Sequence, residues 1–149
     1  MVCWVMMSVC GAQAAGEHPR LLVRAAHYEA LRQRADKEPW RSMREAVQSC
    51  TSLTYRADGS VYRQYASMRH VMRQAALACI LFPQERSRYV THIVEQLGHW
   101  DDLNATRERQ PRSDWSSMVT GGDAFFTSVL ALDVIHDDLS REQLTKIEA

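Results

Sequence analysis

Apolar residues recur along most of this chain at intervals of three and four positions, which is the period of an amphipathic α-helix. No stretch alternates apolar and polar residues for long, so no β-sheet is expected. We therefore expect an all-α fold. The pattern predicts helices over about residues 25–35, from 39, over 61–82, over 85–99, over 121–135 and from 141.

The ends of these helices carry recognisable signals. Pro39 stands where a helix tolerates a missing N–H, and residues 58–60 (Asp-Gly-Ser) are typical of a turn. Ser140 and Gln143 form a capping box that starts the last helix. The short links predict antiparallel helical hairpins, stacked as a solenoid or closed into an (α/α) toroid. Because no repeat period is found, we favour part of an incomplete toroid.

The apolar stripes also predict the core. Residues 75–82 are apolar all round, which indicates burial on more than one side. Four bulky side chains of the stripes are expected to be buried: Met43, Met68, Met72 and Phe125. By contrast, residues 101–117 are polar and predict the longest loop, and loops of that length are usually functional or mobile.

The first fourteen residues resemble a signal peptide. Residues 2–9 are largely apolar but too few to span a bilayer, and Ala12-Gln13-Ala14 would allow cleavage before Ala15. Residues 15–149 would then be the N-terminal part of a toroid domain in the periplasm or outside the cell. A buried N-terminal helix and a lipoprotein acylated at Cys10 are less favoured alternatives.

The charge balance narrows the classes of partner. The chain has 18 basic and 18 acidic residues, so its composition predicts neither nucleic-acid binding nor binding to a membrane surface after leader cleavage. Cys50 and Cys79 would remain after cleavage, and either a disulfide or two free core thiols would fit an oxidising compartment. No Cys/His cluster or cofactor motif is found, so neither a metal nor a cofactor is expected.

Three segments resemble parts of the heparinase II/III-like polysaccharide lyases, including oligo-alginate lyases. The first is residues 18–23 (His-Pro-Arg-Leu-Leu-Val), followed by the helix over 28–35. The second is the helix pair over 75–100, which Trp100 closes. The third is residues 131–143, which are similar to an Ala-Leu-Ala-Tyr-Asp-Trp-Leu…Leu-Ser-x-Glu-Gln pattern and carry Asp133 at its Asp.

The resemblance implies an N-terminal (α/α) toroid followed by a β-sandwich region. It also implies β-elimination on an acidic, uronate-containing polysaccharide. Such chemistry neutralises the uronate carboxylate, removes a proton with a Tyr or His base and protonates the leaving oxygen. The family's Asn-His pair is absent here and the chain stops in mid-helix, so the catalytic residues are expected further downstream and this part alone is expected to be inactive.

Candidate substrate-binding residues are Arg69 and His70 on the long helix, and Arg112 and Trp115 in the polar loop. Arginine pairs with carboxylates in a bidentate manner and tryptophan stacks on sugar rings, so these residue types suit an acidic sugar. Arg107 belongs to the same polar stretch. The alternative is that the arginines pair with nearby acids and that Trp115 packs under the loop.

Two other functions remain open from the sequence. One is a non-catalytic helical-repeat module that binds a protein or a glycan. The other is an α/α-barrel glycoside hydrolase, which would need two carboxylates facing one bond. Adjacent acids such as Asp101 and Asp102 rarely converge in that way, so they do not predict a hydrolase site.

Overall fold

The computed structural model describes residues 18, 19, 21, 23–109 and 115–148, with side chains described throughout except at 108, 109, 115–117 and 148. The leader expected over residues 1–14 lies outside this part of the chain. No strand occurs among the described residues, so the all-α prediction is confirmed. The α-helices are α1 (Tyr28–Ala35), α2 (Trp40–Gln48), α3 (Val61–Leu81), α4 (Arg86–Leu97), α5 (Trp100–Arg109), α6 (Trp115–Ile135) and α7 (Arg141–Glu148).

Short 3₁₀ turns join several of these helices: η1 (Ala25–His27), η2 (Cys50–Ser52), η3 (Pro83–Glu85) and η4 (His136–Asp138). The expected capping box is confirmed. The backbone N–H of Ser140 donates to Gln143 Oε1 at 2.8 Å, and the N–H of Gln143 donates to Ser140 Oγ at 3.2 Å. Together these two bonds satisfy donors that the first turn of α7 would otherwise leave unpaired.

The prediction of a loop over residues 101–117 is wrong for most of its length. Residues 101–109 belong to α5, and α6 already begins at Trp115. Asp101 and Asp102 in the first turn of α5 interact favourably with the helix dipole, and Leu103 is fully buried. A polar helix can therefore form here because one apolar side chain holds it against the core.

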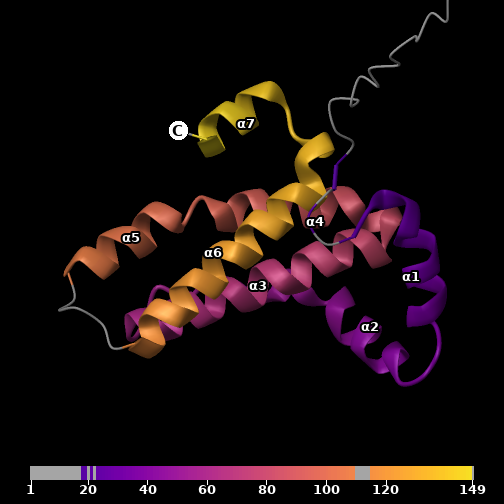
Figure 1. The fold of residues 1–149 in the computed structure, drawn as a ribbon, viewed down its shortest axis with the longest axis horizontal. Helices are drawn as coiled ribbons and strands as arrows, with labels where there is room; N and C mark the ends of the chain where they lie inside the picture. The colour runs from indigo at the N-terminus through magenta and orange to yellow at the C-terminus, as the bar shows by residue number, and fades with distance from the viewer. Residues whose placement is uncertain (1–17, 20, 22, 110–114, 149) are drawn as a thin grey trace, which may run out of the picture.

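Helices α3 and α6 lie side by side and run in the same direction (Figure 1). Near their N-terminal ends, Tyr65 lies beneath Gly121 and the Arg69 guanidinium binds the Asp123 carboxylate at 2.8 Å. Helix α4 returns antiparallel to α3, and Trp100 just after it reaches back to the Tyr65 ring. Antiparallel hairpins are therefore present. In stacked helical hairpins, equivalent helices of successive hairpins also run parallel, as α3 and α6 do here.

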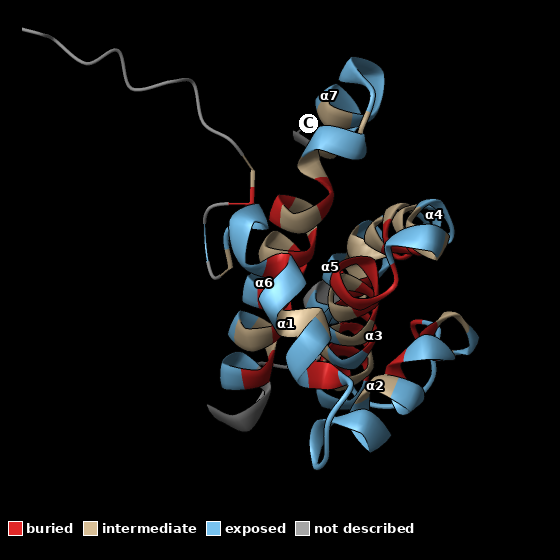
Figure 2. Cartoon of the chain, turned by 90° about the vertical axis from the view of Figure 1, so that its right-hand side faces the viewer, coloured by how far each residue is buried: buried red, intermediate tan, exposed pale blue. Residues whose placement is uncertain are grey.

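The core lies around α3, with α1 and α2 on one side and α4 and α6 on the others (Figures 1 and 2). Met68 and Met72 are fully buried, as expected. The prediction was wrong for Met43 and Phe125, which are 55% and 63% exposed. The short helix α2 buries only Val47, and α6 is apolar around its circumference but packs on α3 with one sector only.

Both described cysteines are free thiols in the core. Burial raises the pKa of Cys50 to about 11 and that of Cys79 to about 12. A thiol with such a pKa carries little thiolate at neutral pH and is a poor nucleophile. The two residues therefore act as small core side chains.

Arg86 fastens three helices together at the end of the bundle. Its guanidinium donates to the backbone carbonyl of Cys79 on α3 at 3.1 Å and to that of Val134 on α6 at 2.7 Å. It also binds the Asp138 carboxylate through Nε and Nη2, the shorter bond being 2.7 Å. The bonds to the two carbonyls are part-buried and those to the exposed Asp138 are not, so losing Arg86 leaves two part-buried carbonyls without that donor.

We expect Arg86→Leu to lower the free energy of unfolding by about 2–3 kcal/mol, because it leaves one carboxylate and two carbonyls without that donor. Arg88→Leu on the same helix is the control, since Arg88 is 54% exposed and should cost about 1 kcal/mol or less. Urea unfolding followed by circular dichroism measures both. Equal losses in the two variants would contradict the role of Arg86.

Candidate functional site

Of the four sequence-predicted site residues, the structure describes the side chains of two, Arg69 and His70. Arg69 is engaged by Asp123, so its charge is already neutralised. His70 is exposed on α3 and makes no ion pair with a described residue. Arg112 lies outside the described residues, and Trp115 begins α6 with a side chain that also lies outside them.

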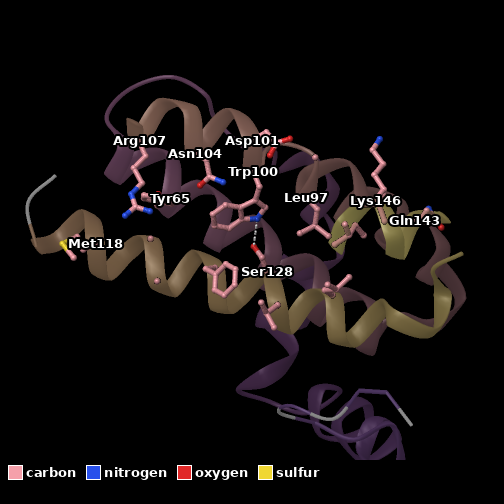
Figure 3. Close-up of a pocket in the computed structure, with 18 residues that line it drawn as sticks. Tyr65, Leu97, Trp100, Asp101, Asn104, Arg107, Met118, Ser128, Gln143 and Lys146 are labelled. Carbon is pink, nitrogen blue, oxygen red and sulfur yellow. Dashed lines mark hydrogen bonds between the residues drawn. The ribbon is translucent and has the colours of Figure 1, made fainter. Parts of the chain in front are cut away.

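A different set of residues lines an open groove of about 990 Å³ between α5 and α6. Figure 3 shows Arg107 and Met118 at one end, Lys146 and Gln143 of α7 at the other, and Trp100 between them. The groove forms because α5 and α6 both pack against the α3–α4 pair without closing on each other. Its size is within the range of small-molecule and oligosaccharide subsites.

Trp100 is the central aromatic residue of the groove. Its indole N–H donates to Ser128 Oγ at 3.2 Å, which fixes the ring (Figure 3). Phe125 meets the ring edge-on with centroids 6.2 Å apart, and Tyr65 lies tilted below at 6.3 Å. Since Trp100 is only half-buried, the groove presents a rigid aromatic wall to a ligand.

Polar side chains along α5 and α7 surround this wall. Asp101, Asn104 and Arg107 follow one another at intervals of three along α5, so they share one side of that helix. Arg107 and Lys146 are exposed and form no ion pair with a described residue. They can bind an anionic group without first breaking a salt bridge.

The described lining suits binding better than proton transfer. Asp101 is the only carboxylate in it, it contains no histidine, and its tyrosine, Tyr65, lies under Gly121 and is 95% buried. No group of three or more potential metal-ligating side chains occurs among the described residues. We therefore assign no catalytic residue within the groove.

Two adjacent glycines of α6 shape the groove differently. A Cβ on Gly121 would lie 3.1 Å from Tyr65 Cε2 and 3.2 Å from Cζ, whereas a Cβ on Gly122 would meet nothing within 4 Å. Tyr65 is 5% exposed, so its ring has little freedom to move aside. Gly121 therefore permits the close packing of α6 on Tyr65, and Gly122 keeps the groove open.

We expect the two glycine-to-alanine variants to change stability in opposite directions. Gly122→Ala should raise the free energy of unfolding by about 0.5–1 kcal/mol through helix propensity alone. Gly121→Ala gains the same propensity but overpacks Tyr65, which typically costs about 1–3 kcal/mol, so it should be net destabilising. Thermal and urea unfolding of the pair compare them directly. A stabilised Gly121→Ala would show that Tyr65 is not tightly held.

An extended segment behind the groove positions the α4–α5 junction. The backbone N–H of Tyr55 donates to Gln96 Oε1 at 2.6 Å, and its hydroxyl donates to Gln64 Oε1 at 2.7 Å. The Tyr55 ring also stacks on His99 at 5.1 Å, directly before Trp100. These contacts hold the turn from which the groove tryptophan projects.

His92 of α4 lies buried beside this segment. It is 6% exposed and its Nε2 has no hydrogen-bond partner among the described residues. Burial lowers its pKa below the ordinary value of 6.5, with a smaller contribution from Arg88, while a hydrogen bond with the Leu53 backbone and the Glu95 charge oppose the shift. The neutral imidazole is therefore the form that the fold accepts.

Acid should weaken the fold through His92. Its pKa is lower in the folded than in the unfolded state, so the unfolded chain binds the proton more readily and stability falls as pH drops through the unfolded pKa. The free energy of unfolding is measured at one pH well above and one well below about 6.5, the ordinary pKa of histidine. We expect the decrease between the two pH values to be smaller in His92→Leu than in the wild type. His70→Leu, at an exposed position, should keep the wild-type pH dependence. If both variants match the wild type, His92 is not the responsible group.

The first and third segments of the family resemblance meet at the end of α6. The buried Asp133 carboxylate binds His18 Nδ1 at 2.7 Å and accepts the backbone N–H of Leu21 at 2.9 Å. The His18 ring stacks on His136 with centroids 3.8 Å apart. His18 thus makes structural contacts and ties the N-terminal segment to the core.

The sequence reasoning missed most of the groove. The sequence predicts Trp100 only as the end of a helix, and its patterns single out neither Asn104 nor Lys146 as a site residue. The available signal was the spacing of Asp101, Asn104 and Arg107, which is helical although the stretch is polar. Of the described residues in the expected polar loop, Asp101, Asn104 and Arg107 line the groove, and Arg107 is the arginine among them.

Comparison of the chain with family models, with curated proteins and with solved structures gave no significant match. By length and composition alone, the stretch Met118–Asp138 could cross a membrane. That is weak evidence, because a core helix of a soluble protein passes the same test, and α6 packs along α3 here.

Proposed function

We propose that this chain is the N-terminal helical region of a secreted or periplasmic heparinase II/III-like polysaccharide lyase, and that its α5–α6 groove binds part of an acidic, uronate-containing polysaccharide. The observation that carries the binding role is the groove itself. It combines a fixed, half-exposed Trp100 with two cations, Arg107 and Lys146, that are free of ion pairs among the described residues.

The chemistry of a uronate fits this combination. A sugar ring offers an apolar face that can stack on the indole of Trp100, and its hydroxyls can bond to the Asn104 amide. A guanidinium at Arg107 can take a carboxylate through two parallel hydrogen bonds. Lys146, at the opposite end, can meet a carboxylate on a neighbouring sugar of the same chain.

Two features of the fold support the family assignment. The contact of His18 with Asp133 gives the first and third resembling segments a common structural role. The parallel packing of α3 and α6 is the arrangement that successive hairpins of an (α/α) toroid require. In this proposal, the proton-abstracting Tyr or His and the Asn-His pair belong to another region of the enzyme.

A second candidate is a non-catalytic helical binding module. It is favoured by the same groove, since the described lining supplies binding groups but no poised acid–base pair. The two functions differ in their products. A lyase leaves an unsaturated uronide that absorbs ultraviolet light, whereas a binding module releases nothing.

Titration of the purified protein with short oligouronates in a calorimeter tests the groove. We expect saturable binding, no comparable binding of a neutral oligosaccharide of equal length, and about tenfold weaker binding in Arg107→Gln and in Lys146→Gln, since a charge-assisted hydrogen bond contributes about 1.5–3 kcal/mol. Lys37→Gln, an exposed lysine remote from the groove, is the matched control. No oligouronate binding, or equal losses in all three variants, would contradict the proposal.

The lyase assignment has its own measurement. The full-length protein, incubated with a panel of uronate polymers, should generate ultraviolet-absorbing unsaturated ends. Reducing ends without that absorbance would indicate a hydrolase, and binding without any product would indicate the binding module.

A further inference from the structure

Helix α3 has an unusual charge composition. None of its 21 residues is acidic, and four are basic: Arg63, Arg69, His70 and Arg73. The charge of Arg69 is neutralised by Asp123 at 2.8 Å. The remaining three basic side chains are exposed and form no ion pair with a described residue.

These three residues, called here the basic stripe, share one face of α3. Arg63 and His70 are seven residues apart, so they lie on the same side about 10 Å from each other along the axis. Arg73 follows His70 by three residues and is its neighbour on the helix surface. Between Arg63 and His70 lie the small side chains of Ala66 and Ser67, and the backbone N–H of Arg56 donates to Ser67 Oγ at 3.1 Å on one edge of the stripe.

Asp58, whose charge interacts with that of Arg63, is already paired with another arginine, Arg56. Two hydrogen bonds from Arg56 lower the pKa of Asp58, and the charge of Arg63 adds to that effect. The Asp58 carboxylate is already held by Arg56 at 2.8 and 3.0 Å. The stripe therefore keeps a local positive charge on a chain whose formal net charge is zero.

We infer that the basic stripe of α3 is a second binding surface for acidic polysaccharide, separate from the α5–α6 groove. Charge complementarity calls for a polyanion, and the ring of Tyr62, 45% exposed and one residue before Arg63, adds a face on which a sugar can stack. Nucleic acid is less favoured, because proteins that bind it usually carry a basic domain and not two arginines and a histidine on a chain of zero formal net charge. The identification of the ligand as a polysaccharide rests on the proposed function, whereas the positive charge of the stripe is independent of it.

Chain length separates the two surfaces experimentally. Binding of a long polyuronate and of a short oligouronate is measured across a salt series for the wild type and for Arg63→Gln/Arg73→Gln. We expect the double variant to bind the long polymer about tenfold more weakly. The slope of log K against log salt concentration should also fall by the equivalent of one to two charges, at roughly 0.7–0.9 per charge. Binding of the short oligouronate in the groove should be unchanged.

Arg24→Gln/Lys37→Gln removes the same charge from two exposed positions elsewhere and serves as the control. An equal loss in the control, or no loss in the stripe variant, would overturn the inference. Single-stranded DNA that competes with the polyuronate at equal charge concentration would overturn the choice of polysaccharide. Failure of the proposed function is distinguishable, because it would appear as absent short-oligouronate binding in the wild type.

Discussion

The packing of α3 against α6 is the contact on which the rest of the described structure depends. Met68 and Met72 on α3 are fully buried, and small residues such as Ala124 and Ala131 on α6 let the two helices approach closely. Polar contacts brace this apolar seam, with the Arg69–Asp123 pair towards its start and the Arg86 bonds at its end. Because both helices are fixed in this way, α4 and α5 pack against this pair, and the α5–α6 groove remains between α5 and α6.

The α5–α6 groove and the basic stripe of α3 differ in shape and in chemistry. The groove is an aromatic cleft with a cation at each end, so it suits a few sugar units in a defined position. The basic stripe is formed by exposed side chains, so it suits a long chain held by charge. If both surfaces bind as proposed, a polymer long enough to reach the groove and the stripe at once would bind more tightly than one that reaches either surface alone.

Local signals in the sequence are sufficient for most of the helices and much of the core. The capping box at Ser140, the turn before α3 and the wholly apolar half of α3 each dictate local structure through nearby residues. The failures share a cause. Whether Phe125 is buried, and whether residues 101–109 pack as a helix, depends on which neighbour covers each face, and periodicity does not name the neighbour. The groove was missed for the same reason, since it lies between helices distant in sequence.

The contact between His18 and Asp133 sets a limit on how the N-terminus can be processed. A buried carboxylate loses two of its hydrogen bonds if the chain is shortened past Leu21, and the stacked pair with His136 is lost as well. A leader removed before Ala15 spares all of these contacts. If the leader is cleaved at the expected site, only residues 15–17 can be trimmed further without removing His18 and its contacts with Asp133 and His136. The segment at His18 is thus a closing element of the fold, held by an aspartate more than a hundred residues away.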